Sequence, residues 1–395
     1  MDIINLKKYI EALESGKRPK GGASLYGIPS LGGEHINTYG GFNLEDSRMK
    51  YVPIEYYNNL SKGIIKTNDI LIVKDGATTG KVAYVDYDFK LKEACVNEHV
   101  FLIRTKKQLY SKYLFYFLYS EIGQNEILKD FRGATVGGIS KEFININMYK
   151  PNLEEQYKVV KLLDKANQLV NKRKEQIEAL DELVKSKFIE MFGDLENNIN
   201  NFNKVKMKDI CNKITDGTHK TPNYLSDGIK FISAKDIKTG KIDLTNTRYI
   251  SLAEYEEIQR RCQLEIGDIL LSKSGSIGTP VVLDNDEPLG IFESLAVLKL
   301  KSNIINNVYA CEFLKSYSAQ RKILFGTKGI SIKHLHLNVL KELEILIPPI
   351  ELQNKFEDFV KQVDKLKFEM ESSLKELEDN FNALMQRAFK GELFK

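Results

Sequence analysis

The sequence predicts an α+β fold in which one chain is duplicated into two mixed α/β globules and two long helices. Three observations predict it: short segments recur about 200 residues apart, each copy mixes strand-like and helical patterns, and each copy ends in a long amphipathic run. Two similar copies on one chain imitate a symmetric pair, so a pseudo-two-fold chain is expected, with globules separated by an antiparallel two-helix coiled coil. We expect globular domains at 1–150 and 196–347, and long helices at 151–195 and 348–395.

The composition is that of an ordinary globular protein with two or three domains. Of its 395 residues, 42% are hydrophobic and 28% are charged, and the formal net charge is +4. This charge permits nucleic-acid binding without demanding it. No run approaches a membrane span and the N-terminus has no signal-peptide core, so a cytoplasmic protein is expected. Four scattered cysteines without a C-x-x-C pair argue against structural zinc and disulfides.

The duplication is clearest in "NDILIVKDGATTGKV" and "GDILLSKSGSIGTPV", in which Asp69 and Asp268 precede matching strands at an offset of 199. Both copies have a strand, a Lys-x-Gly turn and a second glycine. Four further pairs recur in the same order: "GIPSLGGEHI" and "GIKFISAKDI", "YVPIEYY" and "YISLAEY", "VGGISKEFI" and "TKGISIKHL", and "KPNLEEQ" and "IPPIELQ". A long period with only two copies indicates paired domains and not a solenoid.

The turn after the first of these strands imitates a phosphate-binding loop but does not match one. A P-loop requires G-x-x-x-x-G-K-[ST], so that enough backbone N–H groups surround the phosphates and a hydroxyl reaches magnesium. Here Gly76 and Gly80 are one residue too close, and Val82 stands where the hydroxyl is needed. The turn therefore predicts no nucleotide site.

Each globule alternates short β-branched runs with helical patches. The runs are "DILIV", "KVAYV" and "HVFLI" in the first copy, and "IKFIS", "DILLS" and "LAVLKL" in the second. The helical patches "YSKYLFYFLYSEIGQNEI" and "NVYACEFLKSYSAQRKI" correspond as well. Because long runs of matched alternation are missing, an α+β globule is expected in place of a barrel or a doubly wound sheet.

Each copy ends in a long helix that begins after a proline and ends at a glycine. The first extends from Pro151 to Gly193 and the second from Pro349 to Gly391, and roughly 40 residues make a helix ~60 Å long. Apolar residues spaced mostly by three and four predict that the two helices pack on each other along a seam. The candidate partner-binding residues on these helices are Leu169, Ile177, Leu180, Val184, Phe359, Val363, Leu366, Leu377 and Phe381.

Two similar globules on a shared spacer suit a protein that reads two DNA half-sites at a set separation. At this level the chain resembles the specificity (S) subunits of type I restriction–modification systems, and the resemblance covers essentially the whole sequence. Its carriers are the paired segments above, together with "ITDGTHKTPNY" and "FISAKDIKTGKI" in the second half. The first half departs from that pattern, because "SGKRPKGGASLYGIPSLGGEHI" lacks the Asp-Gly-Thr-His element. This departure implies a different subclass of recognition domain.

The resemblance implies a non-catalytic subunit that binds bipartite, asymmetric double-stranded DNA through two target recognition domains. Its helices would act as a spacer and dock two modification (M) subunits, which carry S-adenosylmethionine and methylate an adenine in each half-site. Restriction (R) subunits that use ATP and Mg can join. The chain has no N-P-P-[FY] motif, no Walker A motif and no H-E-x-x-H motif. The adenine would thus be flipped into the partner's pocket, and no cofactor is expected in this chain.

Polar and basic loops are the candidates for DNA contact, because exposed Gly-rich backbone and cations can approach phosphates. In the first half the candidates are Lys17, Arg18, Lys20, Gly21, Gly22, Glu34, His35, Lys74, Lys81, Arg132, Thr135 and Lys141. In the second half they are Thr218, His219, Lys220, Thr221, Lys235, Asp236, Lys273, Ser274, Ser276, Thr327, Lys328, Ser331 and Lys333.

Each candidate also has a structural alternative. The basic loop that carries Lys17, Arg18 and Lys20 can be a solvated surface loop. His35 and Asp236 can belong to turns that satisfy their own hydrogen bonds, in place of reading bases. Lys74 and Lys273 suit a phosphate-facing strand end, but they can equally flank turns that merely need glycine dihedrals.

Alternatives also exist for the function as a whole. One is the specificity subunit of a modification-only or type II-like system. A second is a coiled-coil scaffold that binds protein partners, and a third is an enzyme with an unrecognised site. The last two leave the matched glycine–lysine turns unexplained, and no acid, base and nucleophile converge in the sequence. His334 and His336 lack the further ligands that a metal requires, so no metal is expected.

Overall fold

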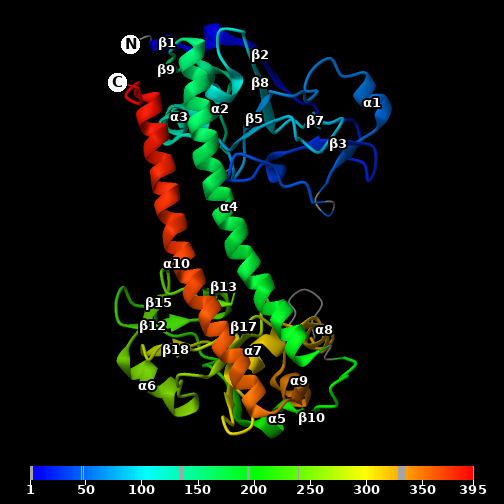
Figure 1. Ribbon diagram of the computed structural model, residues 1–395, viewed down its shortest axis with the longest axis vertical. Helices are drawn as coiled ribbons and strands as arrows, with labels where there is room; N and C mark the ends of the chain where they lie inside the picture. Colours follow the sequence, from blue (N-terminus) through cyan, green and yellow to red (C-terminus); the bar gives the residue numbers. More distant parts are fainter. Residues whose placement is uncertain are drawn as a thin grey trace. The chain divides into compact units, whose positions relative to one another are not determined.

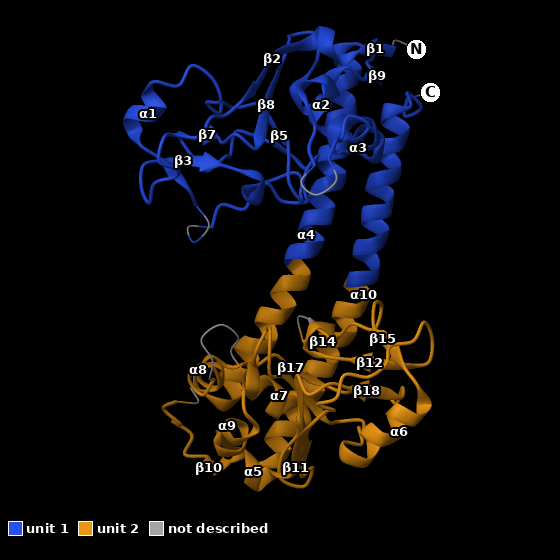
Figure 2. Ribbon diagram, turned by 180° about the vertical axis from the view of Figure 1, so that it is seen from behind, with its two compact units in different colours: residues 1–175, 371–395 blue, residues 176–370 orange. Residues whose placement is uncertain are grey.

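The computed structural model describes residues 3–45, 47, 49–133, 137–193, 196–238, 240–327 and 334–394, with the backbone alone at position 238. It divides into two compact units, which we call unit 1 (residues 1–175 and 371–395) and unit 2 (residues 176–370) (Figure 2). The two long helices are α4 (Leu153–Phe192) and α10 (Ile350–Phe389) (Figure 1). Each helix has one part in unit 1 and the other part in unit 2, as the two colours of Figure 2 show.

Unit 1 contains a four-stranded antiparallel sheet of order β2–β8–β5–β6 and a three-stranded sheet of order β4–β3–β7, in which β3 and β7 are parallel. Strands β1 and β9 form a separate antiparallel pair. The strands are β1 (Ile3–Asn5), β2 (Ile10–Ser15), β3 (Ile28–Leu31), β4 (Tyr51–Val52), β5 (Ile70–Val73), β6 (Val82–Tyr84), β7 (Cys95–Val96), β8 (Val100–Thr105) and β9 (Asn147–Tyr149). The helices are α1 (Ile54–Asn58), α2 (Ser111–Tyr119) and α3 (Glu121–Leu128), with short 3-10 turns η1 (Leu6–Tyr9), η2 (Gly33–His35) and η4 (Lys141–Ile144).

Unit 2 repeats this plan. Its sheets have the orders β11–β19–β16–β17 and β15–β12–β18, again with one parallel pair in the smaller sheet. The strands are β10 (Asn203–Lys206), β11 (Cys211–Asp216), β12 (Ile229–Ile232), β13 (Ile237–Lys238), β14 (Lys241–Ile242), β15 (Arg248–Ile250), β16 (Ile269–Ser272), β17 (Pro280–Val282), β18 (Leu289–Ile291), β19 (Leu295–Leu300) and β20 (Glu344–Ile347). The helices are α5 (Met207–Ile210), α6 (Leu252–Arg261), α7 (Asn307–Lys315), α8 (Tyr317–Phe325) and α9 (Leu337–Glu342), with η5 (Ala234–Asp236). The predicted α+β class and internal duplication are confirmed.

Strands β5 and β16, which correspond and lie inside the two large sheets, are covered on both faces by apolar side chains, which explains why their sequences do not alternate. Side chains of a strand point to opposite faces in turn. In unit 1, Ile70 and Ile72 pack with helix α2, whereas Leu71 and Val73 pack with the smaller sheet. Both faces are therefore covered, and each buried side chain contributes on the order of 1.5–3 kcal/mol.

The long helices bury side chains in the core of each unit and run antiparallel. In unit 1 the beginning of α4 packs with the end of α10, and Lys174 lies 2.8 Å from Glu378. In unit 2 the end of α4 packs with the beginning of α10, where the rings of Phe188 and Phe356 lie 5.4 Å apart. The buried helix residues are Val159, Val160, Leu163, Val170, Phe381 and Met385 in unit 1, and Leu180, Val184, Phe188, Phe356, Val360 and Val363 in unit 2.

Two of the candidate partner-binding residues do not lie in the buried seam between the helices. Leu169 and Leu366 are 55% and 42% exposed. Val170, which follows Leu169 in the sequence, is buried. Lys367 follows Leu366, and its aliphatic stem is covered while its ammonium binds Asp181. Steps of three and four residues cannot decide which of two adjacent side chains points inward when the helix has 3.6 residues per turn. Of the other candidates on the two helices, the buried ones are Leu180, Val184, Val363 and Phe381, and the half-buried ones are Ile177, Phe359 and Leu377.

The glutamine shared by "KPNLEEQ" and "IPPIELQ" anchors each long helix to its globule. Gln156 accepts a hydrogen bond from the Tyr110 N–H at 2.8 Å and donates one to the Pro151 carbonyl at 2.8 Å. Gln353 does the same with the Asn306 N–H and a proline carbonyl, both at 2.8 Å. Both amides are fully buried. Removing either would leave buried polar groups unpaired, which costs about 1–3 kcal/mol each.

None of the helices among the described residues is both long enough and apolar enough to span a membrane.

Candidate nucleic-acid interface

The glycine-rich turns that imitate a P-loop are tight turns built on positive φ angles. Gly76 and Gly80 have φ of 94° and 90°, and their counterparts Gly275 and Gly278 have 68° and 87°. The second glycine of each turn donates its N–H to the end of the preceding strand, at 2.9 Å in unit 1 and 2.8 Å in unit 2. A side chain would be strained at these dihedrals. The shared glycines are therefore explained by backbone conformation alone.

A second duplicated glutamine holds each turn in place. Gln124 of α3 donates to the carbonyls of Gly80 and Leu118 at 2.9 and 2.7 Å. Gln320 of α8 donates to Gly278 and to a carbonyl of α7 at 2.7 and 2.6 Å. Sequence reasoning missed this contact, although both glutamines lie in the helical patches recognised as corresponding.

The two loops predicted to face DNA come together in unit 1. The N–H of Ile139 donates to the Lys74 carbonyl at 2.7 Å, and the N–H of Gly76 donates to Gly137 at 3.1 Å. Arg132, on the same loop, has a side chain that is 79% exposed. In unit 2 the N–H of Leu335 binds the Lys273 carbonyl at 3.0 Å in the same way. Thr135, Lys328, Ser331 and Lys333 lie outside the described residues.

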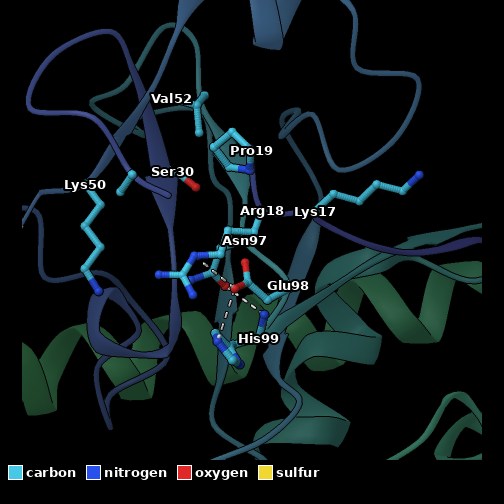
Figure 3. A pocket seen from close by; sticks show the side chains of 10 residues that line it. Lys17, Arg18, Pro19, Ser30, Lys50, Val52, Asn97, Glu98 and His99 are labelled. Atoms are coloured by element: carbon cyan, nitrogen blue, oxygen red, sulfur yellow. Dashed lines mark hydrogen bonds and ion pairs between the residues drawn. The ribbon is translucent and has the colours of Figure 1, made fainter. Parts of the chain in front are cut away.

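The loop that leaves β2 carries the basic candidates of unit 1. Lys17, Arg18 and Lys20 are exposed, and Gly21 and Gly22 turn the loop with φ of 95° and 87°. Arg18 and Lys17 line a cavity of about 90 Å³ that also includes Ser30, Lys50, Asn97, Glu98 and His99 (Figure 3).

Glu98 is the centre of the ionic contacts in this cavity. Its carboxylate lies 3.8 Å from the Arg18 guanidinium and 3.5 Å from the His99 ring, as the dashed lines in Figure 3 mark. His99 also contacts Asp75 at 2.5 Å. Because Arg18 has a side chain that is 70% exposed, its pairing with Glu98 contributes under about 1 kcal/mol. The guanidinium thus remains available to a phosphate or a base edge.

Lys50 was not a candidate but lines the same cavity. Its ammonium binds Glu34 at 2.5 Å. Burial raises the pKa of Glu34, but the hydrogen bond and the charge of Lys50 outweigh it and hold the pKa below its usual value. Glu34, a predicted DNA contact, therefore neutralises a neighbouring lysine at neutral pH.

In unit 2 the loop that leaves β11 occupies the corresponding position. Gly16 and Gly217 open the two loops, and a Cβ on either would collide with the carbonyl of Val96 or Ile291. His219 stands where Arg18 stands in unit 1 and contacts Glu293, the counterpart of Glu98, at 2.7 Å. His219, Lys220 and Thr221 are exposed, and Thr218 is half-buried and accepts a hydrogen bond from the Lys220 N–H at 3.1 Å.

The lysines of the two Lys-x-Gly turns, Lys74 and Lys273, are bound by other groups of this chain. Lys74 donates to the carbonyl of Glu98 at 2.6 Å and lies 3.5 Å from Asp75. Lys273 is buried and binds Asp216 at 2.6 Å. This geometry favours a structural role over a phosphate contact for Lys273.

The predicted base readers His35 and Asp236 are buried. The His35 Nδ1 accepts from the Gly32 N–H at 2.9 Å, and the Asp236 carboxylate accepts from the Ser233 N–H at 2.8 Å. The two side chains cap the matching turns η2 and η5. Of the two roles considered for His35 and Asp236, the geometry supports a turn that satisfies its own hydrogen bonds and not the reading of bases.

The remaining candidates differ in exposure. The exposed ones are Lys141, Lys235 and Ser276, and the half-buried ones are Lys81, Ser274 and Thr327. Beyond the candidates, the guanidinium of Arg248 stacks 4.1 Å from the ring of Tyr224, which is 40% exposed next to the 217–222 loop. Among the described residues no three His, Cys, Asp or Glu side chains form a group that could hold a metal ion.

Sequence reasoning missed four residues of the site, which are Lys50, Glu98, His99 and Glu293. The segments "VNEHVF" and "IFESLA" share only one charged residue, the glutamate, so their match is weak in sequence. A signal did exist, because both segments precede the strands β8 and β19 that correspond in the repeat.

Comparisons with known proteins give one consistent result. The family model of the type I restriction modification DNA specificity domain matches residues 2–179 and again residues 199–379. The specificity subunit of the type I restriction enzyme MjaVIII from Methanocaldococcus jannaschii is 23% identical over 77% of this chain and 74% of its own length. The specificity subunit of EcoKI from Escherichia coli K12 is 22% identical, over 87% of this chain and 82% of its own.

Two solved structures share the fold. One is a chain of a type I R-M system studied for complex assembly and conformational transition, with a TM-score of 0.56, 17% identity and coverage of 99% of this chain and 98% of that one. The other is the S subunit of a type I restriction–modification system from M. genitalium, with a TM-score of 0.52, 15% identity and coverage of 98% and 96%.

Proposed function

Because the chain belongs to the type I restriction modification DNA specificity family, whose domain it carries twice, we propose that each unit reads one half of a bipartite, asymmetric DNA site. The protein is thus the specificity subunit of a type I restriction–modification complex. Membership in this family leaves the protein-binding scaffold and the independent enzyme without support.

One observation carries the proposal: the two units have the same framework but different side chains at the same place. The framework includes the glycine turns, their glutamines and the glutamates Glu98 and Glu293. Against these glutamates stand Arg18 in one unit and His219 in the other. Arginine, histidine and carboxylate groups contact different base edges, so a shared scaffold with different tips supports two different half-sites.

The chain acts without catalysis of its own, as expected of a specificity subunit. DNA and methyltransferase subunits are its partners, and we place two modification subunits on the long helices, where Leu169 and Leu366 are exposed. Those subunits supply S-adenosylmethionine and receive the flipped adenine, while restriction subunits supply ATP and Mg. The helices α4 and α10 serve as the spacer that fixes the distance between half-sites.

Binding of the chain assembled with its modification subunits tests this proposal. The DNA set comprises the cognate duplex found by methylation mapping, duplexes with either half randomised, and duplexes with the spacer changed by two or three base pairs. We expect randomising either half to weaken binding by at least tenfold, because mismatched base pairs cost about 1–3 kcal/mol each. Spacer changes should weaken binding too. Unchanged affinity with one half randomised would contradict two-unit reading, and indifference to the spacer would contradict the role of the helices.

A further inference from the structure

A single buried carboxylate in unit 2 gathers three positively charged or basic side chains from three segments. Asp216, at the end of β11, lies 2.6 Å from the Lys273 ammonium, 2.7 Å from the Arg261 guanidinium and 3.4 Å from the His219 ring. Lys273 follows β16 and Arg261 ends helix α6. The Asp216 side chain is 5% exposed and that of Lys273 10%.

This carboxylate cannot itself face DNA. It is buried, and its negative charge would repel phosphates. Burial raises its pKa, but hydrogen bonds from Lys273 and Arg261 outweigh that effect and hold the pKa below the usual value. Asp216 is therefore ionised at neutral pH, and the positive charges of Lys273 and Arg261 neutralise it within the protein.

What the carboxylate does is fix the first residues of the DNA-facing loop. Asp216 immediately precedes Gly217, and His219 is held on both sides, by Asp216 at 3.4 Å and by Glu293 at 2.7 Å. Lys220 and Thr221 follow directly and are exposed. A loop that is ordered before binding loses less conformational freedom on the DNA, which favours affinity and selectivity.

Unit 1 lacks this arrangement at the corresponding position. Ser15 replaces Asp216 at the end of β2, and Lys74 turns instead to the carbonyl of Glu98. The basic loop is tied by Arg18 to Glu98 at 3.8 Å and by the Tyr56 hydroxyl, which donates to the Lys17 carbonyl at 2.8 Å.

We propose that Asp216 is a positioning residue for half-site selectivity: it holds the loop of residues 217–221 in the conformation that reads the half-site of unit 2. This inference rests on the proposed function, in which that loop faces DNA. A merely structural role would change stability, whereas a positioning role changes the ratio between binding to the cognate and the altered half-site.

The test uses the full chain assembled with its modification subunits and measures Kd for the cognate duplex and for duplexes altered in one half-site. The variants are Asp216→Asn, the double variant Asp216→Asn with Lys273→Met, Glu287→Gln and Lys220→Ala. The double variant removes the buried pair together, so it avoids an unpaired buried ammonium and keeps the fold. Glu287→Gln is the matched control, because it removes one carboxylate of unit 2 that pairs with Lys230 at 2.6 Å.

We expect Asp216→Asn and the double variant to lose about tenfold in discrimination at the half-site of unit 2, which corresponds to ~1.4 kcal/mol. In these variants, discrimination at the other half-site should stay within about twofold of that of the native chain. In the control Glu287→Gln, discrimination at both half-sites should stay within the same limit. Loss of a negative charge alone would instead strengthen binding to all DNA.

Lys220→Ala reports whether the loop contacts DNA, because loss of a phosphate contact weakens DNA binding. If Lys220→Ala does weaken DNA binding, two results would overturn the inference and leave the proposed function intact. One is native discrimination in a folded double variant, and the other is an equal loss at both half-sites. If Lys220→Ala binds all DNA as the native chain does, the loop is not at the interface, and both the inference and the proposed role of this loop fail.

Discussion

The two units build the same loop on the same framework but secure it differently. In unit 2 a buried network centred on Asp216 ties the loop to β16 and α6. In unit 1 the corresponding loop is tied by one long, exposed ion pair and one hydrogen bond to its backbone. A duplicated protein can thus keep its strands, turns and glutamine contacts unchanged while the ends of those strands diverge. Selectivity can change at such ends without any change in the fold.

The largest difference between the units is expected in their response to mutation at the strand end. Asp216→Asn leaves Lys273 buried without its counter-ion, and breaking one side of a buried pair costs roughly 3–5 kcal/mol. Ser15→Ala, at the same place in unit 1, should cost under about 0.5 kcal/mol, as for a substitution outside any buried network. Amide hydrogen exchange in β11 and β19, compared with β2 and β8, measures both. Equal losses in the two units would remove the distinction between them.

The stability lost in Asp216→Asn should depend on pH with a definite sign. Asp216 has a folded-state pKa below its unfolded value, which is about 3.9. Its stabilisation is therefore fully present above that value and is lost as the pH falls through the lower folded pKa. The difference in Tm between the native chain and Asp216→Asn should stay constant from about pH 8 to pH 5 and shrink below about pH 4. A difference that already changes near neutral pH would assign the effect to a group other than Asp216.

Shared elements should respond alike. Gly80→Ala and Gly278→Ala place a Cβ at φ near 90°, 2.9 and 2.8 Å from the side-chain oxygens of Gln124 and Gln320. Each should lose about 1–3 kcal/mol, and the two losses should agree within about 0.5 kcal/mol. Hydrogen exchange in β5 and β16 reports them separately. Losses that differ several-fold would show that the framework is not equivalent in the two units.

The smallest effect is expected from the exposed cations of unit 1. Lys17→Ala with Lys20→Ala should weaken binding to cognate and unrelated DNA alike and reduce the salt slope by about 2, one for each phosphate that the variant no longer neutralises. The fold should be unaffected, since both side chains are exposed. Titrations at several salt concentrations measure the slope. An unchanged affinity and slope would exclude this loop from the interface.

The framework was predictable from sequence because repeats record it directly. Matching strands, glycine turns and proline-started helices each leave a local pattern, and the structure confirms the duplication and the antiparallel pairing of α4 and α10. The side-chain partners were not predictable in this way. The turn sequence makes Lys273 a phosphate candidate, and its counter-ion Asp216 lies 57 residues earlier, where no local pattern can reveal the pair. For His35 and Asp236 the sequence leaves base reading and a self-satisfied turn open, because a polar side chain suits either, and only the structure shows that both cap a buried turn.

The most direct test of the account exchanges the tips of the two units and maps the methylated DNA. One variant carries Arg18→His and His99→Ser, and the other carries His219→Arg and Ser294→His. Ser294 corresponds to His99, because the backbone carbonyl of each accepts the N–H of Lys273 or Lys74. Each variant is expressed with the modification subunits in a host lacking other methylation at the site. Sequencing of methylated adenines then reports the recognised motif. The account predicts that the first variant changes or relaxes one half of the motif, the second variant the other half, and that the spacer stays the same. Changes in both halves from a single variant, or in neither half from both, would contradict it.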